Sequence, residues 1–140
     1  MEPNLWLVLS SFTFLAPALT CYKTSNYFLT SVYILVTVSS LVYHATKNPY
    51  LLYLDYPLMQ FGHVTTLYYI IDGKWVSMPY YTVWLLYVVF IYYYGYKNKI
   101  LVWNPDLEAA TPWHMSLHIS TAAMTCYTVS STHRFLKDIK

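Results

Sequence analysis

The stretch YFLTSVYILVTVSSLVYHAT, residues 27–46, contains no Asp, Glu, Lys or Arg. A helix of about 20 such residues is long enough to cross a hydrocarbon core of roughly 30 Å. Its Tyr, Val and Thr residues would suit a strand in water, but only helices and closed barrels satisfy their own backbone hydrogen bonds in lipid. The stretch is too long and alternates too little for a barrel strand, so it predicts a membrane-spanning helix.

Four further runs have the same character. The five predicted spans cover roughly residues 5–21, 27–46, 51–71, 76–95 and 112–132, and the connections hold most of the charged side chains. Of the 140 residues, 57% are hydrophobic and 10% are charged, whereas soluble domains average about 25% charged residues. The sequence therefore predicts an all-α fold: one domain over residues 1–140, forming a polytopic membrane bundle of about five transmembrane helices.

Composition also limits the partners. Aromatic residues make up 20% of the chain, and its 17 tyrosines suit the headgroup boundary, where the ring meets hydrocarbon and the hydroxyl meets water. A net charge of +2 is too small to indicate binding to nucleic acid or to another acidic partner. The composition therefore favours lipid surroundings and gives no sign of a nucleic-acid partner.

The first span is expected to be a membrane helix and not a cleaved signal peptide. Residues 16–18 (APA) loosely resemble a small-residue cleavage site, but Glu2 and no basic residue precede the span, whereas a signal peptide begins with a basic segment. Cys21 and Cys126 fall toward the same membrane side in a five-span topology. They are expected to be packing residues, which say nothing firm about the redox compartment.

The distribution of basic residues predicts the orientation in the membrane. One side would carry five, Lys23, Lys74, Arg134, Lys137 and Lys140, and the other side three, Lys47, Lys97 and Lys99. Because basic residues are enriched on the cytoplasmic side, we expect a cytoplasmic C-terminus and an exterior or lumenal N-terminus.

Four ionisable side chains fall inside the predicted spans at one membrane face. His44 is near the end of the second span, Asp55 is near the start of the third, and His114 and His118 open the fifth. In an up-and-down topology these positions lie at the same depth. The sequence therefore predicts that these four side chains converge.

Their spacing indicates a metal site. His114 and His118 stand four residues apart on one helix face, close enough to share one ion, and Ser40 lies one turn before His44. Three neutral imidazoles from two helices leave an open fourth position, which is the pattern of catalytic zinc. Asp55 would then accept a proton or a hydrogen bond from the water at the metal, or orient a ligand.

Three motifs resemble those of the alkaline ceramidase and adiponectin receptor superfamily of membrane-embedded metal hydrolases. They are Ser40-Leu-Val-Tyr-His44, the run His44-Ala45-Thr46 leading to Leu54-Asp55, and Trp113-His114-Met-Ser-Leu-His118-Ile119. In that superfamily Ser-x-x-x-His is on the second span, Asp on the third and His-x-x-x-His on the last. The His-Ala-Thr run and its distance to Leu54-Asp55 are most similar to the alkaline ceramidases.

The resemblance implies a zinc ion (Zn2+) bound by His44, His114 and His118, with Asp55 and Ser40 as catalytic residues. It implies hydrolysis of the amide bond of ceramide or a related membrane lipid. Zinc would supply hydroxide at neutral pH, Asp55 would act as base and then as acid, and Ser40 or Tyr43 would steady the developing oxyanion. It also implies a multi-pass protein of an endomembrane (endoplasmic reticulum or Golgi) or of the plasma membrane.

The resemblance covers roughly half the chain, in the second, third and fifth spans. Superfamily members have seven spans, so one helix here would replace three between the Asp motif and the final His pair, which leaves the last helix pointing the same way. The acidic and aromatic segment that ceramidases use for calcium is absent from residues 1–5, and Tyr56 stands where an acidic residue is expected. Because the chain is short, a second copy of it in a homo-oligomer could supply walls of the site that the five predicted spans do not form.

The same residues also allow different roles. The histidines could hold a structural zinc in a non-catalytic receptor or assembly protein, or they could bind haem, although an i, i+4 pair cannot take opposite axial positions. Lys47 could pair with Asp55, and Ser40 could simply pack between helices. His63 and His133, each taken alone, are expected to be packed or interfacial residues.

Overall fold

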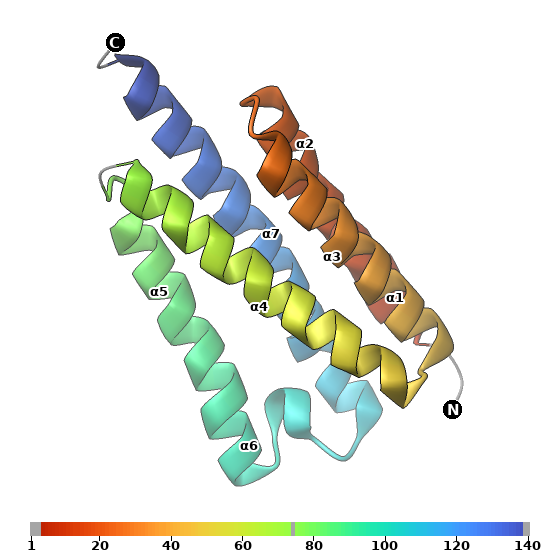
Figure 1. The fold of residues 1–140 in the computed structure, drawn as a ribbon. Coiled ribbons are helices and arrows are strands. Elements are labelled where there is room, and N and C mark those ends of the chain that lie inside the picture. Colours follow the sequence, from red (N-terminus) through yellow and green to blue (C-terminus); the bar gives the residue numbers. More distant parts are fainter. Residues whose placement is uncertain (1–3, 74, 139–140) are drawn as a thin grey trace.

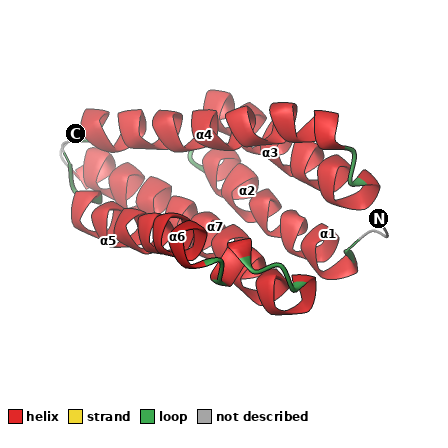
Figure 2. Cartoon of the chain, turned by 90° about the horizontal axis from the view of Figure 1, so that it is seen from below, coloured by secondary structure: helices red, strands yellow, loops and turns green. Residues whose placement is uncertain are grey.

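The computed structural model describes residues 4–73 and 75–138, and within these residues the chain forms helices joined by short loops, with no strand (Figure 2). The α-helices are α1 Leu5–Ser11, α2 Leu15–Lys23, α3 Tyr27–Thr46, α4 Pro49–Asp72, α5 Met78–Val89, α6 Gly95–Asn98 and α7 Leu107–Asp138. A 3-10 turn at Phe12–Phe14 joins α1 to α2, and a π-helical segment at Phe90–Tyr94 joins α5 to α6. The helices therefore form five rods, and the predicted all-α class is confirmed.

An asparagine side chain caps the N-terminus of each of the first three rods. Asn4, Asn26 and Asn48 each precede a helix and accept a hydrogen bond from a backbone N–H of its first turn, at 3.3, 3.1 and 3.0 Å. An asparagine at this position satisfies one of the N–H groups that a helix start leaves without a partner. These caps place the starts of α1, α3 and α4 within two residues of the predicted spans.

The last helix is longer than the predicted span. It runs from Leu107 to Asp138, whereas the sequence predicts a span over residues 112–132. Pro112 suggests a helix start, because proline is favoured in the first turn, but here it lies one turn further in. The helix extends beyond the apolar span at both ends, because the more polar residues that flank the span are helical as well.

The fifth rod, α7, is the central element. It packs against α1, α2, α4 and α5, while α3 packs against α1, α2 and α4. Figure 1 shows α7 crossing behind α4, with the N- and C-termini at opposite ends of the bundle. We call the end that holds the last turn of α3 and the first turns of α4 and α7 the histidine end.

Two helices are long and apolar enough to cross a membrane by length and composition: Leu5–Lys23, which comprises α1 and α2, and Tyr27–Thr46. Glu2, Lys74 and Lys140, used in the sequence-based predictions of the first span and of orientation, lie outside the described residues. Cys21 packs in a cluster with Ala18 and Leu29, as expected for a packing residue.

Candidate metal centre

Three histidines meet at the histidine end of the bundle. His44 comes from the last turn of α3, and His114 and His118 come from α7. Each ring offers one nitrogen that could bind a metal, and these three nitrogens all lie within 4.8 Å of one another. The ring centroids are 4.9 to 5.3 Å apart. The structure thus brings together the three histidines that the sequence predicts to converge, in a cluster that could hold a metal ion.

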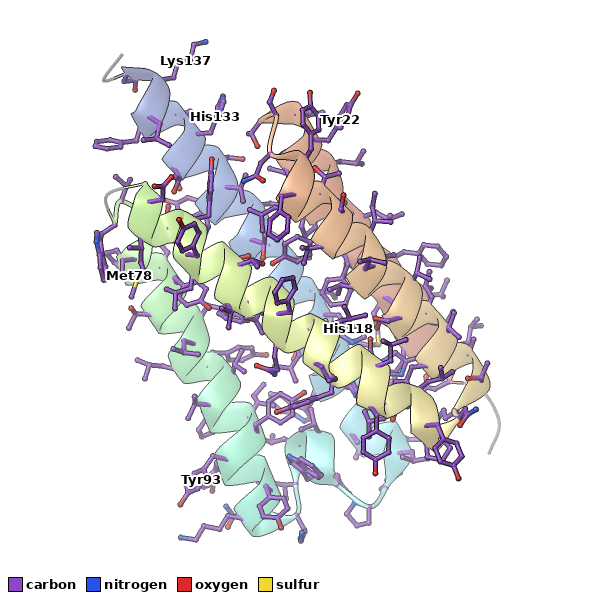
Figure 3. All side chains as sticks on the ribbon, in the orientation of Figure 1. Tyr22, Met78, Tyr93, His118, His133 and Lys137 are labelled. Atoms are coloured by element: carbon purple, nitrogen blue, oxygen red, sulfur yellow. The ribbon has the colours of Figure 1, made fainter. Side chains whose placement is uncertain are left out.

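The cluster lies in the interior. His44 and His118 are only 3% and 4% exposed, and His114 is half-buried. Figure 3 shows His118 within the bundle, whereas His133 and Lys137 lie toward the opposite end of α7. Nε2 of His44 is buried and has no hydrogen-bond partner among residues 4–73 and 75–138. A buried polar atom without a partner costs about 1–3 kcal/mol, and a metal ion shared with the other two imidazoles would remove that cost.

Ser10 of α1 orients His118. Its Oγ lies 3.0 Å from the carbonyl oxygen of Leu7 and 2.9 Å from Nδ1 of His118. A serine hydroxyl has one hydrogen. When it donates that hydrogen to Leu7, the Nδ1–H of His118 donates to Oγ, and Nε2 keeps its lone pair for a metal.

Aromatic contacts hold the rings in place. Phe14, fully buried in the 3-10 turn, packs against His118 with centroids 5.0 Å apart. Tyr43 packs against His44 at 4.9 Å. Since packed side chains lose rotamer freedom, these contacts help keep the imidazoles in one arrangement.

A cavity of about 500 Å³ lies beside the cluster. Its walls come mainly from α4, α5 and α7, and they include His114, His118 and Asp55. Most of the remaining lining side chains are apolar, among them Met59, Leu85 and Leu117. Two of the metal-binding candidates and the predicted catalytic carboxylate therefore share one largely apolar cavity.

Asp55 is buried and is hydrogen-bonded by a residue that no sequence motif marks. Ser39 Oγ donates to Asp55 Oδ1 at 2.8 Å. Among the described residues Asp55 has no cationic partner, and the pairing with Lys47 that the sequence allows is not formed. The hydrogen bond occupies one carboxylate oxygen and leaves Oδ2 available toward a ligand.

Ser40, the predicted catalytic serine, faces another way. It is fully buried, its Oγ lies 2.9 Å from Ser11 Oγ, and it is not among the residues that line the cavity. Ser11 in turn donates to the carbonyl of Leu7. Neither Ser10 nor Ser11 stands in a recognisable motif, so only the docking of α1 against α3 and α7 shows their part in the site.

Comparisons of the chain with protein-family models, with curated proteins and with solved structures return no match.

Proposed function

We propose that the chain is a membrane-embedded, zinc-dependent lipid hydrolase that cleaves the amide bond of ceramide or a related lipid. The proposal is carried by one observation: His114 and His118 of the three-histidine cluster line the same cavity as the buried Asp55. A buried carboxylate and converging imidazoles beside an apolar cavity are the parts that metal-assisted hydrolysis of a lipid requires.

The distribution of apolar side chains supports a membrane location. Large apolar residues are exposed along the outward faces of α3 and α5, including Leu35, Val38, Val83 and Leu86. The interior holds many serines and threonines instead, among them Thr66, Thr125 and Thr128. Such broad apolar exposure is rare on soluble monomers, and small polar residues between helices are typical of membrane bundles.

Many exposed tyrosines and tryptophans lie toward the two ends of the bundle. Those nearer the histidine end are Tyr50, Tyr53, Tyr93, Tyr96 and Trp103, and those nearer the opposite end are Tyr22, Tyr27, Tyr68, Trp75 and Tyr80. Figure 3 marks one of each group, Tyr93 and Tyr22, at opposite ends. Two such belts support a bundle in which all five rods span the bilayer.

The chain's own residues would divide the chemistry. The three imidazoles would hold the metal, and a zinc ion there would supply an acidified water and a Lewis acid for a carbonyl. Asp55, held through Oδ1 by Ser39, takes the proton from the attacking water and passes it to the departing amine. Ser40 steadies the developing charge only if its hydroxyl turns from Ser11 toward His44, one helical turn away.

The test is zinc content together with turnover. Full-length protein purified without chelators should carry about one zinc per chain by elemental mass spectrometry and should hydrolyse a fluorescent ceramide. A His114→Ala, His118→Ala double variant should lose both. His133→Ala is the matched control, because His133 lies on the same helix outside the cluster. Absence of zinc in the wild type would overturn the proposal.

A non-catalytic role for the metal is the second candidate, and one observation favours it. The cluster links α3 to α7, which come from distant parts of the chain, so a bound ion would clamp the bundle in a receptor or assembly protein. This candidate predicts stoichiometric zinc without turnover of any ceramide or lysolipid. A haem site does not fit, because His44 and His114 lie edge to face with centroids 5.0 Å apart, which leaves no room for a porphyrin between them.

Orientation and assembly complete the proposal. The C-terminus would be cytoplasmic and the N-terminus exterior or lumenal, in an endomembrane or the plasma membrane. Water would then reach the cluster from the exterior or lumenal side, and the acyl chain would enter the cavity laterally from the bilayer. A homo-oligomer could cover the outer walls of α4 and α5.

A further inference from the structure

The rings of His63 and Trp84 pack against each other on the wall of the cavity. His63 is on α4 and Trp84 is on α5, their ring centroids are 4.9 Å apart, and both side chains line the cavity. The sequence predicts only a packed or interfacial residue at His63. Its position on the cavity wall gives it a surface that a ligand can reach.

Neither ring has a hydrogen bond to another described residue. Trp84 is 7% exposed and its Nε1 is buried without a partner. The nearby Tyr81 hydroxyl donates to the backbone carbonyl of His63 at 3.3 Å and not to its ring. Polar groups buried among apolar side chains are normally hydrogen-bonded, so Nε1 of Trp84 calls for a partner from outside the described residues. The half-buried ring of His63 stands beside it on the cavity wall.

We propose that His63 and Trp84 recognise a hydroxyl group carried part-way along the acyl chain of the lipid. A hydroxyl can accept the indole N–H of Trp84 and donate to the unprotonated nitrogen of His63, whereas a methylene group can do neither. The inference rests on the proposed function in one respect, because the proposed function places the acyl carbonyl of the lipid at the histidine cluster.

Helix geometry sets the position of that hydroxyl. Asp55 and His63 both lie on α4 and both line the cavity. Their separation of eight residues corresponds to about 12 Å along the helix axis. An extended hydrocarbon chain advances about 1.25 Å per bond, given a C–C length near 1.5 Å. A carbonyl carbon beside Asp55 therefore places His63 and Trp84 opposite a carbon roughly nine to ten bonds further along, which is carbon 10 or 11 of the acyl chain.

The experiment compares three radiolabelled acids by equilibrium dialysis against the zinc-loaded full chain in detergent micelles. The acids are octadecanoic, 10-hydroxyoctadecanoic and 18-hydroxyoctadecanoic acid. The 10-hydroxy acid should bind about tenfold more tightly than the other two. Trp84→Phe should abolish this preference, read within the variant as the ratio of its affinities for 10-hydroxyoctadecanoic and octadecanoic acid. Trp75→Phe is the matched control, since Trp75 is exposed and outside the cavity, and it should keep the preference.

His63→Leu provides a second variant that keeps the side-chain volume similar, and it too should reduce the preference. Equal affinity for the three acids would overturn the inference, because the protein would then not recognise the hydroxyl. A preference that survives in both variants would overturn it as well, because other residues would then bind the hydroxyl. Failure of the proposed function gives a different result. Selective binding without amide turnover would overturn the hydrolase and leave this recognition standing, whereas turnover without selectivity would overturn only the recognition.

Discussion

At the scale of single residues, Ser10 has the clearest role that no motif announces. Its hydroxyl lies within hydrogen-bond distance of Nδ1 of His118, although the two residues are 108 positions apart in the sequence. With Nδ1–H as the donor in this contact, Nε2 is the free nitrogen. Hydrogen-bond partners of metal-binding histidines commonly contribute 10- to 100-fold to metal affinity. The hydroxyl of Ser10 should therefore matter for zinc binding without touching the ion.

We expect Ser10→Ala to weaken zinc binding about 10- to 100-fold, because the Nδ1–H of His118 loses its acceptor and the ring can change tautomer. The measurement is competition against a zinc-chelating dye in detergent. Ser31→Ala is the matched control, because the exposed Ser31 bonds only the backbone of its own helix. Equal zinc affinity in the two variants would show that Ser10 does not orient the ligand.

The candidate site is predictable from sequence only in part, for a physical reason. The histidines stand out because ionisable side chains are costly inside a membrane span and because their i, i+4 spacing fixes a shared face. Serine carries no such cost and suits any helix interface. Whether Ser39 or Ser40 faces Asp55 depends on the rotation of α3 against α4, which the sequence of one helix does not determine.

At the scale of helices, the close approach of α4 and α7 depends on a residue without a side chain. Gly73 follows the last turn of α4, and a Cβ placed there would overlap the side chain of Thr132 on α7. Thr132 is fully buried, so it has little space in which to move. The end of α4 can dock against α7 only because position 73 is glycine.

Gly73→Ala should destabilise the protein by about 1–3 kcal/mol, since overpacking forces neighbouring groups to shift. Thermal unfolding in detergent measures the loss. Adding Thr132→Ala removes the overlapping methyl group, so the double variant should be less destabilised than the sum of the two single variants. Additive effects would mean that the two positions do not meet.

Helix ends and helix irregularities differ in how well the sequence predicts them. The asparagines before α1, α3 and α4 coincide with the starts of the apolar runs, so those boundaries are predictable. The π-helical segment at Phe90–Tyr94 is not, because no glycine or proline within those residues marks it. A π-helical turn is rare and occurs inside otherwise α-helical runs, so the apolar sequence alone is interpreted as one uninterrupted span.

At the scale of the whole molecule, the metal ion would join α3 and α7, two helices that pack against the same neighbouring helices. His44 belongs to α3 and the other two ligands belong to α7, and both helices pack on α1, α2 and α4. An ion held by both helices would favour the folded bundle over any state in which they separate. Zinc should therefore act on global stability as well as on chemistry.

We expect the unfolding temperature in detergent to rise with zinc concentration and to fall when the metal is removed by a chelator. At a free zinc concentration about 100 times the dissociation constant, the stabilisation should be about 2.7 kcal/mol. His44→Ala should abolish the dependence on zinc, and magnesium should not replace zinc, because it prefers oxygen ligands. An unfolding temperature insensitive to chelation would contradict a metal shared by the two helices.

The same division of the ligands between residue 44 and residues 114 and 118 has a consequence for biosynthesis. A ribosome translates residue 44 long before residues 114 and 118, so His44 would leave the ribosome while its two partners are still untranslated. An ion held by all three histidines could bind only after residue 118 has emerged. Metal capture would then be one of the last steps of maturation, and a chain stalled before residue 118 would lack at least one of the three ligands.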